Sequence, residues 1–106
     1  KLWLVTPASI TEQEFNPAQI GLSGYTLNDL LGGTANDNAD LARDLLAGKG
    51  RPALRDAVCL NAGGALWLTG LAVSIEEGFA LARKSFVDGS LLAKVNEVKA
   101  AIHALA

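Results

Sequence analysis

The first residues of the chain are apolar on both sides of a strand. Leu2 and Leu4 point to one face and Trp3 and Val5 to the other, because successive side chains of a strand alternate between its faces. A strand that is apolar on both faces is typical of the interior of a layered sheet. The chain also lacks an initiator methionine. We therefore expect it to belong to a longer polypeptide, whose upstream backbone supplies hydrogen bonds to this strand.

A second and more polar strand is predicted from Ile10 to Phe15, and its composition is typical of a sheet edge. Residues 6–9 form the turn before it, since Pro7 presets the backbone angle and Ser9 can bond its own neighbours. Asn16 and Pro17 then end the strand. The pattern predicts a β-hairpin followed by a helical remainder, without a repeat, linker or low-complexity stretch.

The first predicted helix covers about residues 37–47, with Asn36 as its N-cap and Gly48 just after its end. Asn38 falls within the apolar arc of this helix, so we expect its side chain to turn inward and bond the loop at residues 31–34. The other members of the arc are Leu41, Ala42, Leu45 and Leu46.

The second predicted helix, residues 52–70, has proline at its first position, where the missing N–H costs nothing. Residues 57–68 carry no charge and are apolar on every side, so we expect other elements to surround them. Gly63 and Gly64 each cost about 1 kcal/mol in a helix interior, which a close backbone approach would offset. Asn61 is predicted to be buried and bonded, on a stripe with Leu54, Val58, Ala65 and Leu68.

Two further helices complete the pattern. The third opens with a capping box at residues 74–77 and ends before Gly89. The fourth covers residues 91–105. The apolar stripe of the third helix contains Ile75, Phe79, Ala82 and Phe86, and that of the fourth contains Leu91, Val95, Val98, Ile102 and Leu105.

Composition narrows the classes of partner. A chain of 106 residues, 50% apolar and 19% charged, is one small domain or part of one. Its net charge of -2 provides no basic stripe for nucleic acid. The longest uncharged run, residues 57–75, is interrupted by Asn61 and Thr69 and is too short to span a membrane. A single cysteine, Cys59, excludes an internal disulfide and fits a reducing compartment, so we expect a cytoplasmic protein.

Two glycine-containing segments could in principle bind phosphate. Gly32 and Gly33 precede a helix start, whose N–H groups attract anions, but Asp37 and Asp40 would repel a phosphate there. The segment at residues 48–51 lacks the spacing of a phosphate-binding loop. We interpret both segments as turns, where glycine permits a positive backbone angle.

Metal and nucleophile chemistry have few candidates. Asp37, Asp40 and Asp44 repeat at helical spacing and are interpreted as a solvated face. His103 has no visible partner, and one histidine with one cysteine cannot supply a zinc site. Cys59 is interpreted as an inert buried thiol. We therefore assign no catalytic, cofactor-binding or metal-binding residue within the chain, and we expect Ser74 to act as a cap and Trp3 and Trp67 to pack in the core.

The order and spacing of several motifs resemble the C-terminal region of the anthranilate phosphoribosyltransferase family, over essentially the whole chain. The differences are Asp88 before Gly89, Gly63 and Gly64 in place of small alanines, and a longer alanine-rich tail after Val98. The motifs that carry the resemblance are Phe15-Asn16-Pro17 with Ile20-Gly21-Leu22, Gly32-Gly33 with Asn38-Ala39, Gly48-Lys49-Gly50, Arg55-Asp56-Ala57-Val58 with Leu60-Asn61-Ala62, and Ser74 with Glu76-Glu77-Gly78 and Leu81-Ala82-Arg83.

The resemblance implies an α/β fold of the nucleoside phosphorylase and phosphoribosyltransferase type. It implies that residues 1–106 are one segment from the C-terminal part of the large domain, outside the helical N-terminal domain and the phosphate-binding part. The implied reaction moves a phosphoribosyl group from phosphoribosyl pyrophosphate to anthranilate in tryptophan biosynthesis. Magnesium, held by residues upstream of this segment, and a homodimer formed through the helical domain are implied as well. The segment itself is expected to be structural support and inactive alone.

Two other interpretations remain open at this point. The chain could be a stand-alone helical interaction module, whose apolar edge near Trp3 binds a partner. It could also belong to a pyrimidine nucleoside phosphorylase, which shares the architecture but cleaves a different glycosidic bond.

Overall fold

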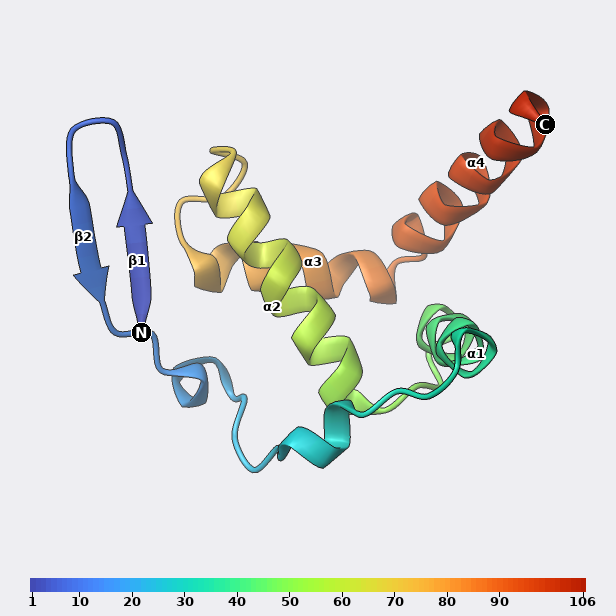
Figure 1. Ribbon diagram of the computed structural model, residues 1–106, viewed down its shortest axis with the longest axis horizontal. Helices are drawn as coiled ribbons and strands as arrows, with labels where there is room; N and C mark the ends of the chain where they lie inside the picture. Colours follow the sequence, from blue (N-terminus) through green and yellow to red (C-terminus); the bar gives the residue numbers. More distant parts are fainter.

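The computed structural model describes residues 1–106 and contains the expected hairpin and four helices (Figure 1). Two short 3-10 helices, which the sequence pattern did not predict, lie between the hairpin and the first α-helix. The elements are β1 (Leu2–Val5), β2 (Ile10–Gln13), η1 (Pro17–Ile20), η2 (Leu27–Leu30), α1 (Ala35–Leu46), α2 (Pro52–Leu68), α3 (Ile75–Val87) and α4 (Ser90–Leu105).

The packed centre of the molecule is the crossing of α2 over α3 (Figure 1). Gly63 and Gly78 meet there, so closely that a Cβ atom on Gly63 would lie 2.5 Å from the backbone nitrogen of Phe79. The close approach predicted for Gly63 is therefore confirmed, whereas Gly64 faces open space and has no such neighbour. Only seven residues of the chain are buried, and they are Ala53, Asp56, Cys59, Gly63, Ala72, Gly78 and Phe79.

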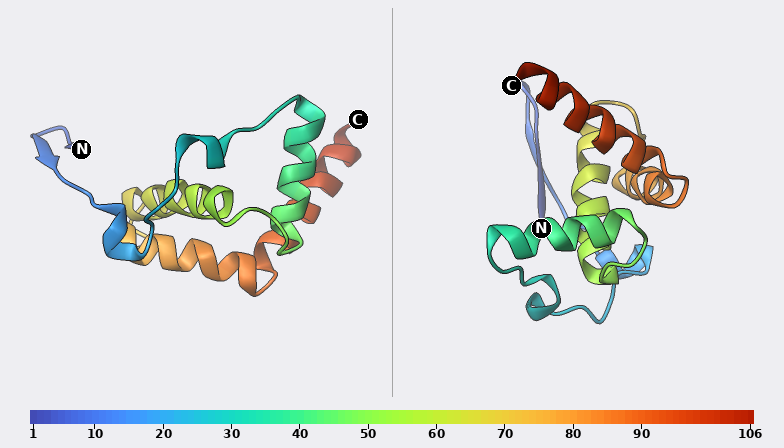
Figure 2. Two further views of the ribbon diagram at one scale, coloured as in Figure 1. Left: turned by 90° about the horizontal axis from the view of Figure 1, so that it is seen from below. Right: turned by 90° about the vertical axis from the view of Figure 1, so that its right-hand side faces the viewer.

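The remaining elements extend away from this crossing, and the molecule measures 44 × 34 × 26 Å (Figure 2). The expectation that other elements surround α2 is wrong for this structure, because Val58 and Leu68 are 48% and 69% exposed. Asn61 lies on the same open side. Its side chain is exposed and donates to the carbonyl of Ala57 within its own helix, so its predicted burial is also wrong.

Helix α1 begins two residues earlier than predicted. Its N-cap is Thr34, not Asn36: the Thr34 hydroxyl accepts from the N–H of Asp37, and the Asp37 carboxylate accepts from the N–H of Thr34. This reciprocal capping box satisfies two N–H groups that a helix start otherwise leaves unpaired. Gly48 follows the helix with φ of 75°, as its predicted place after the helix end requires.

Strands β1 and β2 form an antiparallel two-stranded sheet in which Trp3 lies opposite Glu12 and Val5 opposite Ile10. The predicted turn closes through backbone hydrogen bonds between Thr6 and Ser9. Strand β2 ends two residues before the predicted Phe15. Trp3 is 57% exposed, so its expected place in the core is wrong, and its indole N–H donates to the Glu12 carboxylate at 3.0 Å.

The last two helices form where the pattern places them. Ser74 caps α3 by accepting from the N–H of Glu77, but the Glu77 carboxylate reaches back to the N–H of Val73 rather than to that of Ser74. The fourth helix packs little, since every residue after Leu91 is exposed. None of the helices combines the length and the apolarity that a bilayer crossing requires.

Candidate functional site

The one buried charged group of the chain is Asp56, which is 3% exposed in the second turn of α2. It belongs to the stripe of α2 that faces the crossing. Sequence reasoning placed Asn61 and its stripe inside and missed Asp56. The signal that could have found it is the spacing of Asp56 from Cys59 and Gly63, because residues three and four apart share a helix face, and Gly63 is the residue that a neighbouring helix must approach.

Two side chains satisfy the Asp56 carboxylate. The hydroxyl of Tyr25 donates to Oδ2 at 2.9 Å, and Nε of Arg55 donates to Oδ1 at 3.0 Å. Tyr25 comes from the segment before η2, 31 residues away in sequence. Its hydrogen bond to Asp56 raises the pKa of the Tyr25 phenol above the ordinary value of 10.0, because ionisation would place a second negative charge beside the carboxylate.

Cys59 lies one helical turn beyond Asp56 and is 0% exposed. Burial raises the pKa of its thiol above the ordinary value of 9.0, and the negative charge of Asp56 acts in the same direction. Thiolate is the nucleophilic form of cysteine. The interpretation of Cys59 as a buried thiol is thus confirmed, and the structure offers it no activating base.

Arg51, just before α2, connects this helix to the segment that carries η2. Its guanidinium donates to the carbonyl of Leu31 at 2.7 Å and to that of Asp29 at 3.3 Å. A planar guanidinium can donate hydrogen bonds to two carbonyl groups at once, and a lysine ammonium group is less suited to this geometry. Together with the bond from Tyr25 to Asp56, this contact holds residues 25–31 against the start of α2.

The segment at Gly32 and Gly33 is a loop whose next two N–H groups, those of Gly33 and Thr34, are already occupied. The N–H of Gly33 donates to the side-chain oxygen of Asn38 at 2.9 Å, as the sequence predicted for Asn38, and the N–H of Thr34 donates to Asp37. The hydrogen bonds from the Thr34 hydroxyl and N–H lower the pKa of the Asp37 carboxyl below its ordinary 3.8. A phosphate would have to displace these contacts and approach a carboxylate. The positive backbone angle predicted for Gly32 and Gly33 is wrong, because neither has a positive φ. Glycine is required there because a Cβ atom would collide with the side chain of Asn38 or Asp37.

The segment at residues 48–51 is likewise a helix cap. The N–H of Gly48 donates to the carbonyl of Leu45, and the N–H of Lys49 donates to that of Asp44. These bonds satisfy carbonyl groups that the end of α1 would otherwise leave unpaired. The amide groups therefore face the helix end and do not converge on a ligand.

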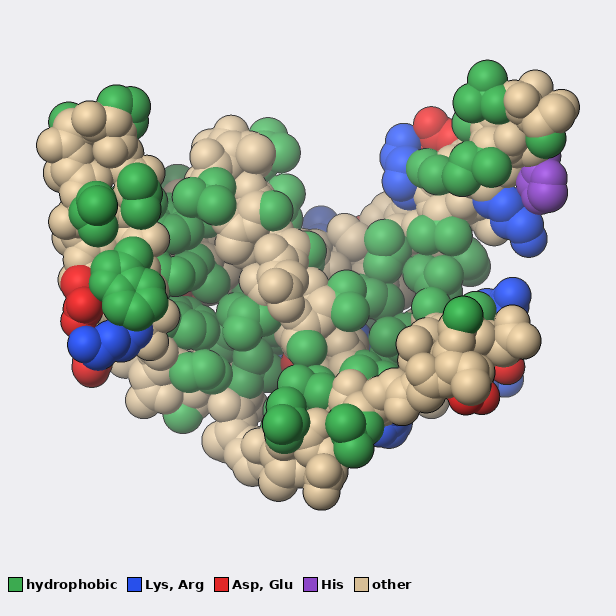
Figure 3. Space-filling view, viewed as in Figure 1, with side chains coloured by type: hydrophobic (Ala, Val, Ile, Leu, Met, Phe, Trp, Pro, Cys, Tyr) green, Lys and Arg blue, Asp and Glu red, His purple; other side chains and the backbone are tan.

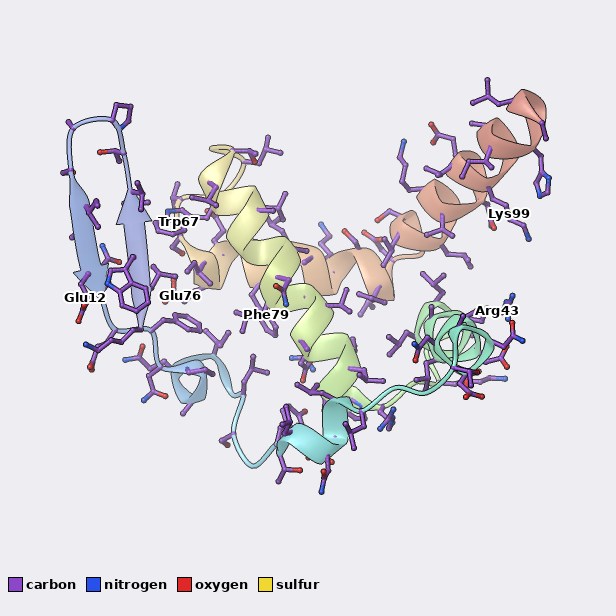
Figure 4. The ribbon with its side chains drawn as sticks, in the orientation of Figure 1. Glu12, Arg43, Trp67, Glu76, Phe79 and Lys99 are labelled. Carbon is purple, nitrogen blue, oxygen red and sulfur yellow. The ribbon has the colours of Figure 1, made fainter.

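No three carboxylate, histidine or cysteine side chains come close enough together to hold a metal ion. Asp37 is engaged in the cap of α1, and Asp40 pairs with Arg43 on the exposed side of that helix (Figure 4). Magnesium prefers several oxygen ligands in octahedral geometry. The residues of this chain do not fit such a site. His103 is exposed near the end of α4 and makes no side-chain hydrogen bond.

An apolar hollow of about 370 Å³ lies along α2 and α3 and reaches the start of α4. Hydrophobic side chains gather on this side of the molecule and form a concave surface between the hairpin and α4 (Figure 3). Small residues make up much of the hollow, whose lining includes Val58, Ala62, Ala65, Ala82, Ser85 and Leu91. Its polar groups are too few to orient a reacting ligand.

Taken together, the polar groups of the chain serve caps, turns and one buried node. The hydrogen-bonded group of Asp56, Tyr25 and Arg55 holds the η2 segment to α2. It does not place a nucleophile beside a base, and group transfer through a covalent intermediate needs such a pair. The large exposed areas of the molecular surface are apolar.

Comparison with known proteins gives a consistent result. Residues 1–92 match the family described as the glycosyl transferase family, a/b domain. The chain is similar to anthranilate phosphoribosyltransferases from Rubrobacter xylanophilus (46% identity over 79% of this chain and 25% of the relative) and Moorella thermoacetica (39% over 94% and 29%). It is also similar to that of Lacticaseibacillus paracasei (42% over 86% and 26%). The chain thus spans about a quarter of the length of these relatives. No solved structure matches it.

Proposed function

Because this chain belongs to the glycosyl transferase family, a/b domain, we propose that it is the C-terminal supporting segment of an anthranilate phosphoribosyltransferase. In the proposed reaction, a phosphoribosyl group passes from phosphoribosyl pyrophosphate to the amino nitrogen of anthranilate. The observation that carries the proposal is the similarity of nearly the whole chain to relatives of that one name. The proposal includes a cytoplasmic location, a homodimer, and magnesium bound by residues outside this chain.

The contacts of the chain support a positioning role. Tyr25 and Arg51 hold the η2 segment to α2, and the glycine contact between α2 and α3 fixes how these helices cross. The buried Asp56 carboxylate is occupied by its hydrogen bonds from Tyr25 and Arg55. The chemistry therefore falls to the remainder of the domain in this proposal, while residues 1–106 hold that remainder in place.

The exposed apolar surface supports the same role. Large apolar side chains are exposed on the hairpin and on α2, α3 and α4, and a soluble protein rarely leaves so much apolar surface uncovered. A domain several times larger would cover it. Those side chains include Trp3, Val5, Val58, Leu68, Leu71, Val98 and Ile102.

The test compares the 106-residue chain with a chimera. In the chimera, this chain replaces the matching segment of the full-length Moorella thermoacetica relative. With phosphoribosyl pyrophosphate, magnesium and anthranilate, we expect the chain alone to leave anthranilate fluorescence unchanged and the chimera to remove it. The unmodified relative is the positive control.

Two results would contradict the proposal. One is anthranilate consumption by the isolated chain, which would place reactive groups within residues 1–106. The other is a folded chimera that does not consume anthranilate but cleaves a pyrimidine nucleoside in the presence of phosphate. That result would favour nucleoside phosphorylase chemistry.

A further inference from the structure

We propose that the groove between α1 and α4 binds an amphiphilic carboxylate, a ligand in which one carboxylate is joined to an aliphatic chain. Such a ligand is neither of the two substrates of the proposed reaction, so either proposal can fail without the other. The volume of the groove, its apolar walls and the two cations that line it favour this class of ligand.

The groove forms because the end of α1 lies beside the corner that joins α3 to α4, where it shares a hollow with Phe86 and Gly89. At this corner Gly89 has a φ of 80°, and the Asp88 carboxylate accepts from the N–H of Ser90 at 2.9 Å. Leu91 lines the apolar hollow along α2 and α3 and so places the first turn of α4. Helix α4 therefore extends away from α3 and leaves one side open toward α1 (Figure 1).

The groove has the volume of a small-molecule site. It measures about 440 Å³, within the range of about 300–1,000 Å³ that is typical of ligand pockets. An α-helix with its side chains is about 10 Å wide and rises about 5.4 Å per turn, so one helical turn would already fill this volume. A small ligand therefore fits the groove better than a helix of another protein does.

The walls of the groove are aliphatic. Leu46 and Ala47 line it from α1, and Leu92 and Val95 line it from α4. Leu92 and Val95 are 41% and 38% exposed, so a ligand in the groove would remove apolar surface from water. The lining contains no aromatic side chain on which an aromatic ligand could stack, which favours an aliphatic chain.

Two cationic side chains, Arg43 of α1 and Lys99 of α4, line the groove from its two walls. Both are labelled in Figure 4, and Lys and Arg side chains border the gap between the two helices on both sides in Figure 3. The other polar side chain of the lining is Asn96, and no carboxylate is among the lining residues. The groove is therefore complementary to an anion whose remaining surface is apolar.

Both cations can bind a ligand carboxylate. The ion pair of α4 joins Lys94 to Glu97, and Lys99 forms none. Arg43 donates to Asp40 at 2.6 Å, in a pair whose side chains are both 72% exposed. Exposed pairs contribute little to stability, and a guanidinium has five N–H donors, so Arg43 can donate to a ligand as well. A carboxylate between Arg43 and Lys99 would also offset the repulsion between these two like charges.

Binding of octanoate to the chimera, followed by NMR of the methyl groups of Leu46, Leu92 and Val95, tests the site without relying on activity. We expect these resonances to shift on titration, with a Kd of about 1–10 mM for a ligand of this size in an open groove. Hexanoate should bind about 3- to 10-fold more weakly, because it buries two fewer methylene groups.

Glutamine variants test the role of the two cations. Arg43 and Lys99 are exposed, so their replacement should leave the fold intact. We expect Arg43→Gln and Lys99→Gln each to weaken octanoate binding about 2- to 5-fold, and the double variant to weaken it about 10-fold, since the effects of separate sites add. Lys94→Gln is the matched control on α4. It should leave the Kd unchanged, because Lys94 does not line the groove. Octanol, which lacks the charge, should bind all variants equally.

Each remaining outcome decides against the site or against the reaction. Groove resonances that do not respond to octanoate would overturn the proposal, as they would if the remainder of the domain covers the groove in the chimera. An unchanged Kd in the double variant, or an equal effect on octanol, would do the same. Octanoate binding in a chimera that does not consume anthranilate would contradict the proposed reaction and leave the carboxylate site intact.

Discussion

Gly63 of α2 and Gly78 of α3 lie backbone against backbone, and a Cβ atom on Gly78 would come within 2.9 Å of the Cα atom of Gly63. The contact explains why both helices tolerate glycine in their interiors, where it costs about 1 kcal/mol relative to alanine. It also sets the distance between the two helices that contain all but one of the buried residues.

Gly63→Ala in the chimera is expected to lower the free energy of unfolding by about 1–3 kcal/mol, because the added methyl group forces the helix backbones apart. Gly64→Ala is the matched control. Its Cβ would meet no atom within 4 Å, so the gain in helix propensity should leave stability unchanged or raised by up to about 1 kcal/mol. Urea unfolding measures both, and equal destabilisation by the two variants would refute the role of the crossing.

Tyr25→Phe removes the hydroxyl that donates to Asp56 at 2.9 Å while keeping the ring. We expect a loss of about 0.5–1.5 kcal/mol in the chimera, the usual range for one hydrogen bond, and faster amide exchange in residues 25–31. Asp56→Asn retains an oxygen that accepts from Tyr25, so these amides should be less affected. Identical exchange in wild type and Tyr25→Phe would show that the bond does not hold the segment.

The cap of α1 is expected to weaken in acid. Hydrogen bonds from Thr34 hold the pKa of Asp37 below its ordinary 3.8, so Asp37 binds fewer protons in the folded than in the unfolded chain at low pH. Its contribution to stability is fully present above about pH 3.8 and is lost as the pH falls through the lower, folded pKa. An NMR titration of the Thr34 amide should follow this loss.

Asp37→Asn should remove most of that pH dependence from the first turn of α1. Asp44→Asn on the same helix is the control, because no side-chain contact to Asp44 is present to be lost. If the Thr34 amide titrates in Asp37→Asn as it does in the wild type, another carboxyl is responsible.

Cys59 is expected to resist thiol reagents in the folded chain. The thiol is fully buried, and its pKa is raised by burial and by Asp56. A reagent therefore cannot easily reach the sulfur atom, and little of the thiol is ionised to thiolate near neutral pH. Reaction with a chromogenic disulfide should be slow in the chimera and fast after denaturation in urea. The denatured sample serves as the control for reagent and cysteine content, and rapid reaction of the native protein would contradict the buried position.

Local chemistry made the helices predictable. Pro52, Ser74 and Gly48 mark helix ends through a missing donor, a side-chain acceptor and a positive φ, and all three occupy those positions. The first helix start was misplaced because Thr34 and Asn36 are both good caps, and only the reciprocal bond to Asp37 distinguishes them. The bond from the loop to Asn38 was predicted correctly because its partner lies five residues away, but the predicted inward position of Asn38 is wrong, since the residue is exposed.

Burial was less predictable because it depends on contacts between distant residues. Asn61 and Asp56 lie on different stripes of α2, and hydrophobicity alone favoured the stripe of Asn61. Asp56 faces inward because Gly63, on the same stripe of α2, allows α3 to approach closely. Tyr25, 31 residues away in the sequence, then donates a hydrogen bond to the buried carboxylate. Trp3 is exposed for the related reason that nothing in the chain reaches its face of β1.

The sequence alone determined the hairpin, the order of the four α-helices and which family the motifs resemble, since these depend on residues close together in the chain. Tertiary structure alone decided which side of α2 is buried and what Asp56 binds. The physical reason is that a helix or strand presents several possible faces, and only packing against a distant partner selects one of them.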